Sequence, residues 1–388
     1  MISILLGRYF YATRAALAIF NRRGKLMHAK ALHHLRQSIV MLLVFALFLP
    51  ATSSAEQYFD RYGLAPASPT LDLGVQPLGY PSSVVSVVMR HDRILNKALA
   101  DSKQPLKTHP FKSGTDMLAL LANQKLEAAV LGDMPSILAA STGNIWIAGI
   151  TKQTSVAIVA KGDIQVRDLV GQRIGYVEAS TSHYTLLQGL ASAGISETKV
   201  KLIPLSVGDM PDALERGEID AFAAWEPATS ASLGNSKENH IVFRGSSATY
   251  FVIEQDFARR APQAALYLVA GLVRAIEWMR RSHSNTEKAA RWAMAETASF
   301  SGKPATLSVT QIASITHREI LDIPSAPAIL NNPSSPTLKN EYQFLTQLGK
   351  LPPGGKWENV ATALSYDGMT KVLAEPRKFQ IHSYDYED

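Results

Sequence analysis

Three consecutive hydroxyl side chains stand where a helix is expected to begin. Ser180, Thr181 and Ser182 follow the apolar residues 174–177, and the leucines after them recur at helical spacing. One of the three is expected to cap the helix, whose free N–H groups and positive dipole end favour an anion. His183, in the first turn, is a further donor to such an anion, or a structural histidine. No nucleophile–base pair accompanies them, so the stretch predicts a site that holds a small ligand without reacting with it.

An acidic residue follows each of two apolar strands. These are Asp133 and Glu226, and each precedes a proline by one or two positions. Either one hydrogen bonds a ligand amine or caps the helix that follows it. Trp225, which ends the second strand, is expected to form a wall for the organic part of a ligand, with core filling as the alternative.

The polar loop 76–83 repeats the arrangement nearer the N-terminus. It contains Tyr80 and ends in two serines, and one of these is expected to cap the helix that follows. With this loop, the residues predicted to bind the ligand come from four loops, and catalytic residues, metal ligands and cofactors are not expected. The predicted ligand-binding residues are Tyr80, Ser82, Ser83, Asp133, Met134, Ser180, Thr181, Ser182, His183, Trp225 and Glu226.

The elements that must position these loops alternate between strand and helix, which predicts an α/β fold with mainly parallel pairing and ligands beyond the carboxyl ends of the strands. An offset of 93 positions aligns Asp133 with Glu226 and the segments before them, so two related αβ units are expected. The apolar run 154–160, and the run 241–243 together with 250–253, are interpreted as two crossings between two lobes. Lobe 1 would comprise 71–155 and 243–388, and lobe 2 would be the insert 156–242.

After residue 253 the chain is expected to be helical. Its apolar spacing predicts a long core helix over 262–281 and further helices up to the C-terminus, separated by a loop at 324–336. The further helices are expected at 285–299, 309–320, 337–348 and 359–373.

Composition excludes several classes of protein. The 388 residues include no cysteine, which excludes disulfides, thiolate metal sites and a cysteine nucleophile. Seven of the 39 Lys and Arg residues, but none of the 33 Asp and Glu residues, lie in 1–55, which leaves 32 basic against 33 acidic residues in the rest. The part expected to fold is therefore not basic, and a nucleic-acid partner is not expected.

The N-terminal 55 residues have the pattern of an export signal. Eleven apolar residues, 39–49, follow Lys30 and Arg36 and precede the small residues Ser53 and Ala55. This arrangement predicts a secretory signal, an arm over 56–70 and a periplasmic protein. A retained membrane anchor is the alternative, although eleven residues are short for a span. Met27 is a second possible translation start.

Three segments resemble the periplasmic substrate-binding proteins of ABC importers for sulfonates, nitrate and taurine, a fold group that includes proteins for thiamine pyrimidines. The segments are DLVGQRIGYVEASTSHYTLLQGLASAGI, GEIDAFAAWEP and LEAAVLGDMPSILAAS. The resemblance implies a type II periplasmic binding protein with two mixed sheets, flanking helices and a two-strand hinge. It also implies capture of a small anionic ligand, first of all an aliphatic sulfonate, for the transmembrane subunits of an ABC permease by a monomeric protein.

Two departures and two alternatives qualify that resemblance. Pro77 and Pro81 in the first loop mean that the family's contacts transfer poorly there, and Asp133 suits an amine-bearing or hydroxylated ligand better than nitrate. Nitrate, taurine or a thiamine-type pyrimidine are the alternative ligands. A biosynthetic enzyme on the same fold is the other alternative, but the cysteine-rich motif of the pyrimidine synthase is absent.

Overall fold

The computed structural model describes residues 60–329 and 336–387. Two compact units divide at residue 61, and the unit 62–388 contains the sheet and the helices described below. Two predicted features of the N-terminal segment lie outside the described residues, namely the apolar run 39–49 and the cleavage site. Residues 330–335 of the loop predicted at 324–336 also lie outside them. Within the described residues, no helix is both long and apolar enough to span a membrane.

One mixed sheet of eight strands runs through the unit, in the order β2-β1-β3-β8-β4-β7-β5-β6. β8 and β4 pair antiparallel at its centre, β3 and β7 pair antiparallel with β8 and β4, and the outer pairs are parallel. The strands are β1 (Leu71–Val75), β2 (Leu106–Pro110), β3 (Ala128–Gly132), β4 (Ile145–Lys161), β5 (Arg173–Tyr176), β6 (Lys201–Pro204), β7 (Ala221–Ala224) and β8 (Asn239–Glu254).

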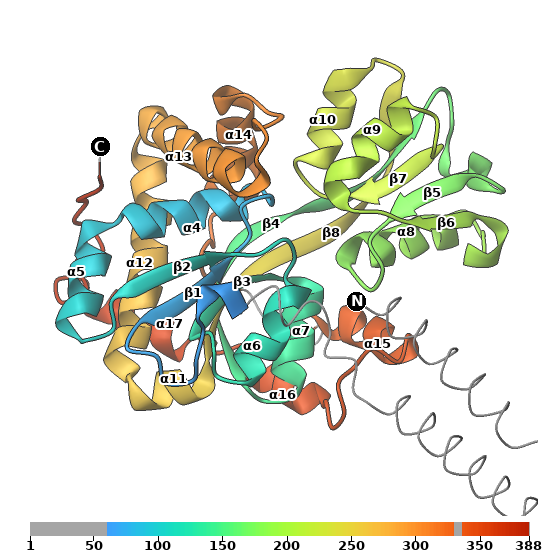
Figure 1. The fold of residues 1–388 in the computed structure, drawn as a ribbon. Helices are drawn as coiled ribbons and strands as arrows, with labels where there is room; N and C mark the ends of the chain where they lie inside the picture. Colours follow the sequence, from blue (N-terminus) through green and yellow to red (C-terminus); the bar gives the residue numbers. More distant parts are fainter. Residues whose placement is uncertain (1–59, 330–335, 388) are drawn as a thin grey trace, which may run out of the picture. The chain divides into compact units, whose positions relative to one another are not determined.

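The prediction of two separate sheets is wrong. β4 and β8 are 17 and 16 residues long, more than twice the length of any other strand, and each is continuous through both halves of the sheet. β8 pairs with β3 through residues 249–253, near its C-terminal end, and β4 pairs with β7 through residues 157–160, near its own C-terminal end. Figure 1 shows these two strands crossing from the half that contains β1, β2 and β3 to the half that contains β5, β6 and β7. The predicted crossings are therefore present, but they join the two halves into one sheet.

Helices cover the faces of both halves (Figure 1). The long helix predicted at 262–281 is present with those bounds, whereas the single helix predicted at 359–373 is two helices. The α-helices are α4 (Ser82–His91), α5 (Arg93–Asp101), α6 (Leu118–Ala122), α7 (Asp133–Ser141), α8 (Thr181–Ser192), α9 (Met210–Glu215), α10 (Ala228–Asn235), α11 (Gln255–Arg260), α12 (Pro262–Arg281), α13 (His283–Ser301), α14 (Val309–Thr316), α15 (Lys339–Gln347), α16 (Trp357–Ala363) and α17 (Asp367–Ala374).

Short turns of other helix types join these elements. The 3-10 helices are η1 (Asp60–Tyr62), η2 (Thr115–Met117), η3 (Val166–Leu169), η4 (Glu197–Lys199) and η5 (Val207–Asp209). The helix predicted at 309–320 changes to a π-helix, η6 (His317–Leu321), over its last residues. Such segments are frequent at functional sites.

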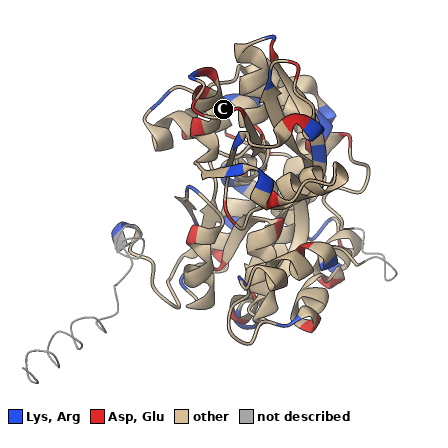
Figure 2. Cartoon of the chain, turned by 90° about the vertical axis from the view of Figure 1, so that its right-hand side faces the viewer, with Lys and Arg blue, Asp and Glu red and all other residues tan. Residues whose placement is uncertain are grey.

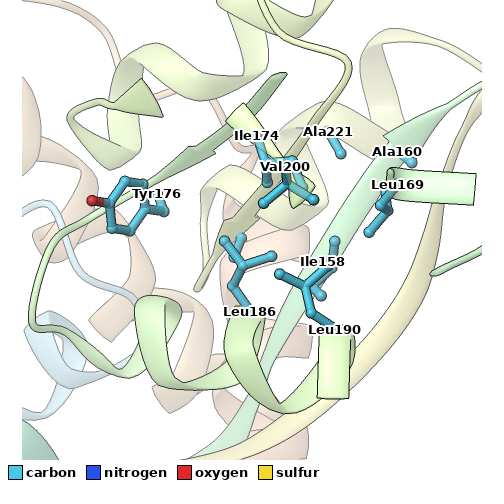
Figure 3. Packing of buried hydrophobic residues seen from close by; sticks show 10 residues of the cluster. Ile158, Ala160, Leu169, Ile174, Tyr176, Leu186, Leu190, Val200 and Ala221 are labelled. Carbon is cyan, nitrogen blue, oxygen red and sulfur yellow. The ribbon is translucent and has the colours of Figure 1, made fainter. Parts of the chain in front are cut away.

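The internal repeat corresponds to two equivalent units. α6, β3 and α7 form one helix–strand–helix unit, and α9, β7 and α10 form the other. Because side chains alternate along a strand, the apolar residues of β4 and β7 form cores on both faces of the second half. Figure 3 shows the core under α8, where Leu186 and Leu190 meet Ile158 and Ile174.

α8 lies unusually close to the two long strands. A Cβ on Gly189 of α8 would lie 2.5 Å from Cδ1 of Ile158, and a Cβ on Gly245 of β8 would lie 2.6 Å from Oγ1 of Thr185. The absence of a Cβ at both glycines therefore permits the close approach of α8 to the strands that join the halves.

Charged residues of both signs are interspersed along the chain. In Figure 2 the Lys and Arg residues do not collect on one element of the face in view, and Asp and Glu residues lie among them. The picture agrees with the near-neutral charge expected for the folded part.

Candidate functional site

The N-terminus of α8 is capped by Ser180. Its hydroxyl oxygen accepts from the N–H groups of Ser182 at 3.1 Å and His183 at 3.4 Å, and it donates to the carbonyl of Val177 at 2.6 Å. The Ser182 hydroxyl accepts from the Val177 N–H at 3.2 Å. The expected cap is therefore present, and it uses two of the N–H groups that were predicted to face an anion.

Thr181 makes a contact of a different kind. Its hydroxyl donates to Oδ1 of Asp133, the first residue of α7, and both side chains are buried. Oδ1 also accepts from Met134 N–H at 2.8 Å, and Oδ2 accepts from Ala248 N–H at 3.3 Å. Burial raises the pKa of Asp133, and these three donors oppose that rise. The contact joins the N-termini of α7 and α8, one from each half of the sheet.

A buried lysine lies beside this contact. Lys152 of β4 is 5% exposed, and its ammonium group interacts electrostatically with Glu319, Asp133 and Glu226. Among the described residues, no carboxylate oxygen lies within 4.0 Å of its Nζ and no hydrogen bond to it is present. Burial lowers the pKa of Lys152, and the three carboxylates act in the opposite direction.

The π-helix η6 adds two charged residues to this region. Nη2 of Arg318 lies 2.9 Å from Oε1 of Glu319 and 3.2 Å from Oε1 of Glu226. The side chain of Glu319 is 3% exposed, and its Oε2 has no partner in the described part of the chain. Burial raises the pKa of Glu319, while Lys152 and Arg318 lower it.

These three residues were missed in the sequence. Lys152 could have been found, because it is the one charged residue in the otherwise uncharged stretch 145–160. Arg318 and Glu319 gave no such signal, since they lie on a helix whose charged face would ordinarily be exposed. Only the packing of η6 against β4 brings them to the site.

His183 lies on the side of α8 that α15 covers. Its Nδ1 accepts from Ala179 N–H at 3.3 Å, so Nε2 carries the proton of the neutral ring, and Nε2 is buried without a partner among the described residues. Its ring lies edge-on to Tyr176 and to Phe344 of α15, with centroids 4.7 Å and 5.6 Å away. Burial lowers the pKa of His183. Nearby, Nζ of Lys350 lies 2.9 Å from Oε1 of Glu178, and both charges act on His183.

Glu226 and its neighbours occupy the equivalent end of β7. Glu226 is buried and accepts from the N–H and the hydroxyl of Ser230, at 3.0 Å and 2.8 Å, so it caps α10 as well as pairing with Arg318. Trp225 is half-buried, and Met134 is fully buried beside Asp133. Binding roles for Trp225 and Met134 remain predictions.

The first loop differs from the prediction. The capping position of α4 is Pro81, without a side-chain cap, and Ser82 and Ser83 lie inside the helix. The expectation of a serine cap was therefore wrong, because α4 begins one residue earlier than the serine pattern suggested. The Tyr80 hydroxyl lies 2.8 Å from Oγ1 of Thr297 in α13, and Tyr80 is 1% exposed. A binding role for these residues remains a prediction.

Comparison with known proteins gives one family match and two partial relatives. The model of the NMT1-like family matches residues 65–294, more than half of the chain. A protein of Escherichia coli (strain K12) named for binding aliphatic sulfonates is 29% identical over 163 residues, which are 40% of this chain and 50% of that protein. The taurine-binding periplasmic protein of the same organism is 30% identical over 162 residues, 39% of this chain and 51% of that protein. The alignments thus span about half the length of these relatives.

Solved structures of periplasmic binding proteins have the same fold. The aliphatic sulphonate binding protein SsuA of Escherichia coli superposes with a TM-score of 0.62 at 19% identity, covering 78% of this chain and 99% of that one. The alkanesulfonate-binding SsuA of Xanthomonas axonopodis pv. citri gives 0.58 at 20% identity, with coverage of 77% and 99%. The nitrate-binding NrtA of Synechocystis PCC 6803 gives 0.57 at 13% identity, with coverage of 81% and 91%. The chain therefore belongs to the NMT1-like family, as the resemblance of its sequence to sulfonate-, nitrate- and taurine-binding proteins implied.

Proposed function

We propose that the chain is the solute-binding component of an ABC importer. It captures a small organic anion, first of all an aliphatic sulfonate, and delivers it unchanged to the transmembrane subunits of a permease. The single observation that carries this proposal is the contact between Thr181 and Asp133. It places the N-termini of α7 and α8, from opposite halves of the sheet, around one set of buried polar side chains.

The arrangement of strands supports capture by closure. β4 and β8 run through both halves, so a change in their twist would rotate one half against the other. Rotation of this kind is the usual hinge motion around a ligand. In this proposal lobe 2 comprises 156–242, and the ligand replaces the contact between Thr181 and Asp133. Ser180, Ser182 and His183 then line one side and Trp225 the other.

A periplasmic location is consistent with this proposed function. The relatives include a taurine-binding protein that is named as periplasmic, and the N-terminal residues 1–55 have the pattern of a secretory signal. We propose that the mature protein begins near Glu56 and works in the periplasm.

Calorimetric titration of residues 56–388 tests the function. The ligands are ethanesulfonate, taurine, nitrate and a 4-amino-5-hydroxymethyl pyrimidine, each followed by mass spectrometry of the recovered ligand. We expect saturable binding of a sulfonate at one site and recovery of the ligand unchanged. Absence of binding to all four compounds would contradict the proposal, and conversion of a bound compound would favour an enzyme instead.

A further inference from the structure

We propose that Lys152 is the counter-ion of the ligand's acidic group and that Glu319 accepts the ligand's amino group. The site would thus select a short compound that carries both an acidic and an amino group. This inference rests on the proposed function, which it deepens by assigning the charged ends of the ligand to named residues. Neither residue belongs to the loops that the sequence indicated.

The first step is the burial of Lys152. Burying an ammonium group without a hydrogen bond or a close carboxylate is energetically unfavourable. Lys152 is 5% exposed and, within the described residues, has neither. The three surrounding carboxylates are near enough to attract it but all lie beyond 4.0 Å. The remaining partners of the ammonium group are therefore water or a ligand, and an anionic group of a ligand would supply both hydrogen bonds and the opposite charge.

The second step is the position of Lys152 on the hinge. Lys152 lies opposite Thr249 of β8 in the strand pairing. Ala248, which precedes Thr249, donates its N–H to Asp133. Lys152 therefore lies next to the point where α7 and α8 meet. A ligand bound there would contact both halves of the sheet at once, as the proposed closure requires.

The third step is the free oxygen of Glu319. Arg318 holds Oε1 at 2.9 Å, and the Thr154 hydroxyl also lowers the pKa of this carboxyl, while Oε2 is buried and makes no hydrogen bond with the described residues. A buried carboxylate oxygen without a donor is costly, and an amino group of a ligand would supply the donor. Arg318 also holds Glu226, so two of the three carboxylates that attract Lys152 are fixed in place.

The balance of charge selects the class of ligand. The buried side chains of Asp133, Glu226 and Glu319 face one ammonium group, and Arg318, which is 56% exposed, adds a second cation at the edge. A ligand with an acidic group alone would pair with Lys152 but leave these carboxylates in excess. A ligand that also carries an ammonium group matches both signs.

The N-terminus of α8 is less suited to hold the anion alone. The Ser180 cap already occupies the N–H groups of Ser182 and His183, and the hydroxyl of Thr181 donates to Asp133. These donors would have to exchange partners before they contact a ligand, whereas the ammonium group of Lys152 makes no hydrogen bond within 60–329 and 336–387 that it would have to break.

Calorimetric titration with ethanesulfonate and taurine separates the two roles. The two probes have the same sulfonate and carbon chain, and only taurine has an amino group. Lys152→Met keeps the length of the side chain and removes its charge, so it should weaken both probes about 10- to 100-fold. Glu319→Gln should weaken the binding of taurine by a similar factor and change the affinity for ethanesulfonate less than threefold. Lys161→Met is the control, because Lys161 is on the same strand but pairs with Glu215 at 3.2 Å; it should leave both affinities unchanged.

Several outcomes would overturn the inference. If Lys152→Met binds both probes as the parent does while Ser180→Asp loses binding, the anion lies at α8, and the proposed function stands without Lys152. An equal loss of both probes in Glu319→Gln would refute the amino-group assignment. If the parent binds neither probe, the proposed function fails and the inference with it. If Lys152→Met does not fold, spectra of ¹⁵N-lysine-labelled parent protein test the role instead. The Nζ signal of Lys152 is identified as the one that is absent from the spectrum of Lys152→Arg. Ethanesulfonate should shift this signal, and an unshifted signal would refute the role of Lys152.

Discussion

At the scale of residues, the site consists of polar groups that are buried and unevenly satisfied. Asp133 accepts three hydrogen bonds, whereas among the described residues the ammonium group of Lys152 makes no hydrogen bond and Oε2 of Glu319 has no partner. Buried polar groups are normally paired, and in the proposed site a ligand would pair with Lys152 and Glu319. The hydroxyl groups at 180–182 could be predicted from their types and spacing. The buried lysine could be predicted only in part, because the sequence does not show what surrounds it.

Replacing Thr181 tests the contact between the halves. Thr181→Val removes the donor and leaves Oδ1 of Asp133 with one hydrogen bond fewer, so the free energy of unfolding should fall by about 1–3 kcal/mol. Thr185→Val is a matched control, because Thr185 is also buried on α8 but its hydroxyl has no partner in the described residues. The control should be neutral or stabilising. Urea denaturation of both variants measures the difference, and equal losses would show that the Asp133 contact contributes nothing specific.

The buried carboxylate of Glu319 predicts a dependence of stability on pH. Burial raises its pKa above the usual 4.5, so as pH rises from about 4 the unfolded chain releases this proton before the folded protein does. The folded state then holds more protons, and stability falls with rising pH in the window between the two pKa values. Glu319→Gln cannot titrate, so its melting temperature relative to the parent should rise across that window. A difference that is constant from pH 4 to pH 8 would contradict the prediction.

At the scale of elements, the sequence predicted those features of the helices that depend on residues close together in the chain. Apolar spacing gave the bounds of α12, and the hydroxyl run gave the cap of α8. Contacts between distant segments decided the rest. The helix expected at 359–373 is interrupted where Leu364 pairs with Ile147 and the Ser365 carbonyl accepts from the Trp146 indole at 3.0 Å. The length of β4 and β8 likewise exceeds the apolar runs, because polar residues between them still pair.

α15 should stabilise the site by packing against α8. Phe344 is buried, and its ring lies 5.6 Å from that of His183 and 5.0 Å from that of Tyr184. Phe344→Ala should lower the free energy of unfolding by about 3 kcal/mol, mainly through the cavity that it leaves. Gln343→Ala, at an exposed position of the same helix, should change it by less than about 0.5 kcal/mol. Equal effects in urea denaturation would show that α15 does not pack on α8 in solution.

At the scale of the whole molecule, the two halves share one sheet and meet at one buried polar cluster. The sequence predicted the two halves, their repeat and the crossings, since each leaves a pattern in the chain. It predicted two sheets where there is one, because the pairing of β4 with β8 is a property of two segments about ninety residues apart. It also could not show that the C-terminal region supplies Arg318 and Glu319 to the cluster. The proposed capture of a solute between the halves therefore rests on contacts that only the folded chain reveals.

The distance between the halves, measured with and without ligand, tests capture by closure most directly. The chain has no cysteine, so spin labels can be placed at Ala100→Cys on α5 and Ala191→Cys on α8, both exposed, without other sites of reaction. Pulsed electron paramagnetic resonance should show a broad distribution of distances without ligand and a narrower, shorter one with saturating taurine. Identical distributions in the two conditions, at a taurine concentration where calorimetry shows binding, would contradict closure of the halves on a captured solute.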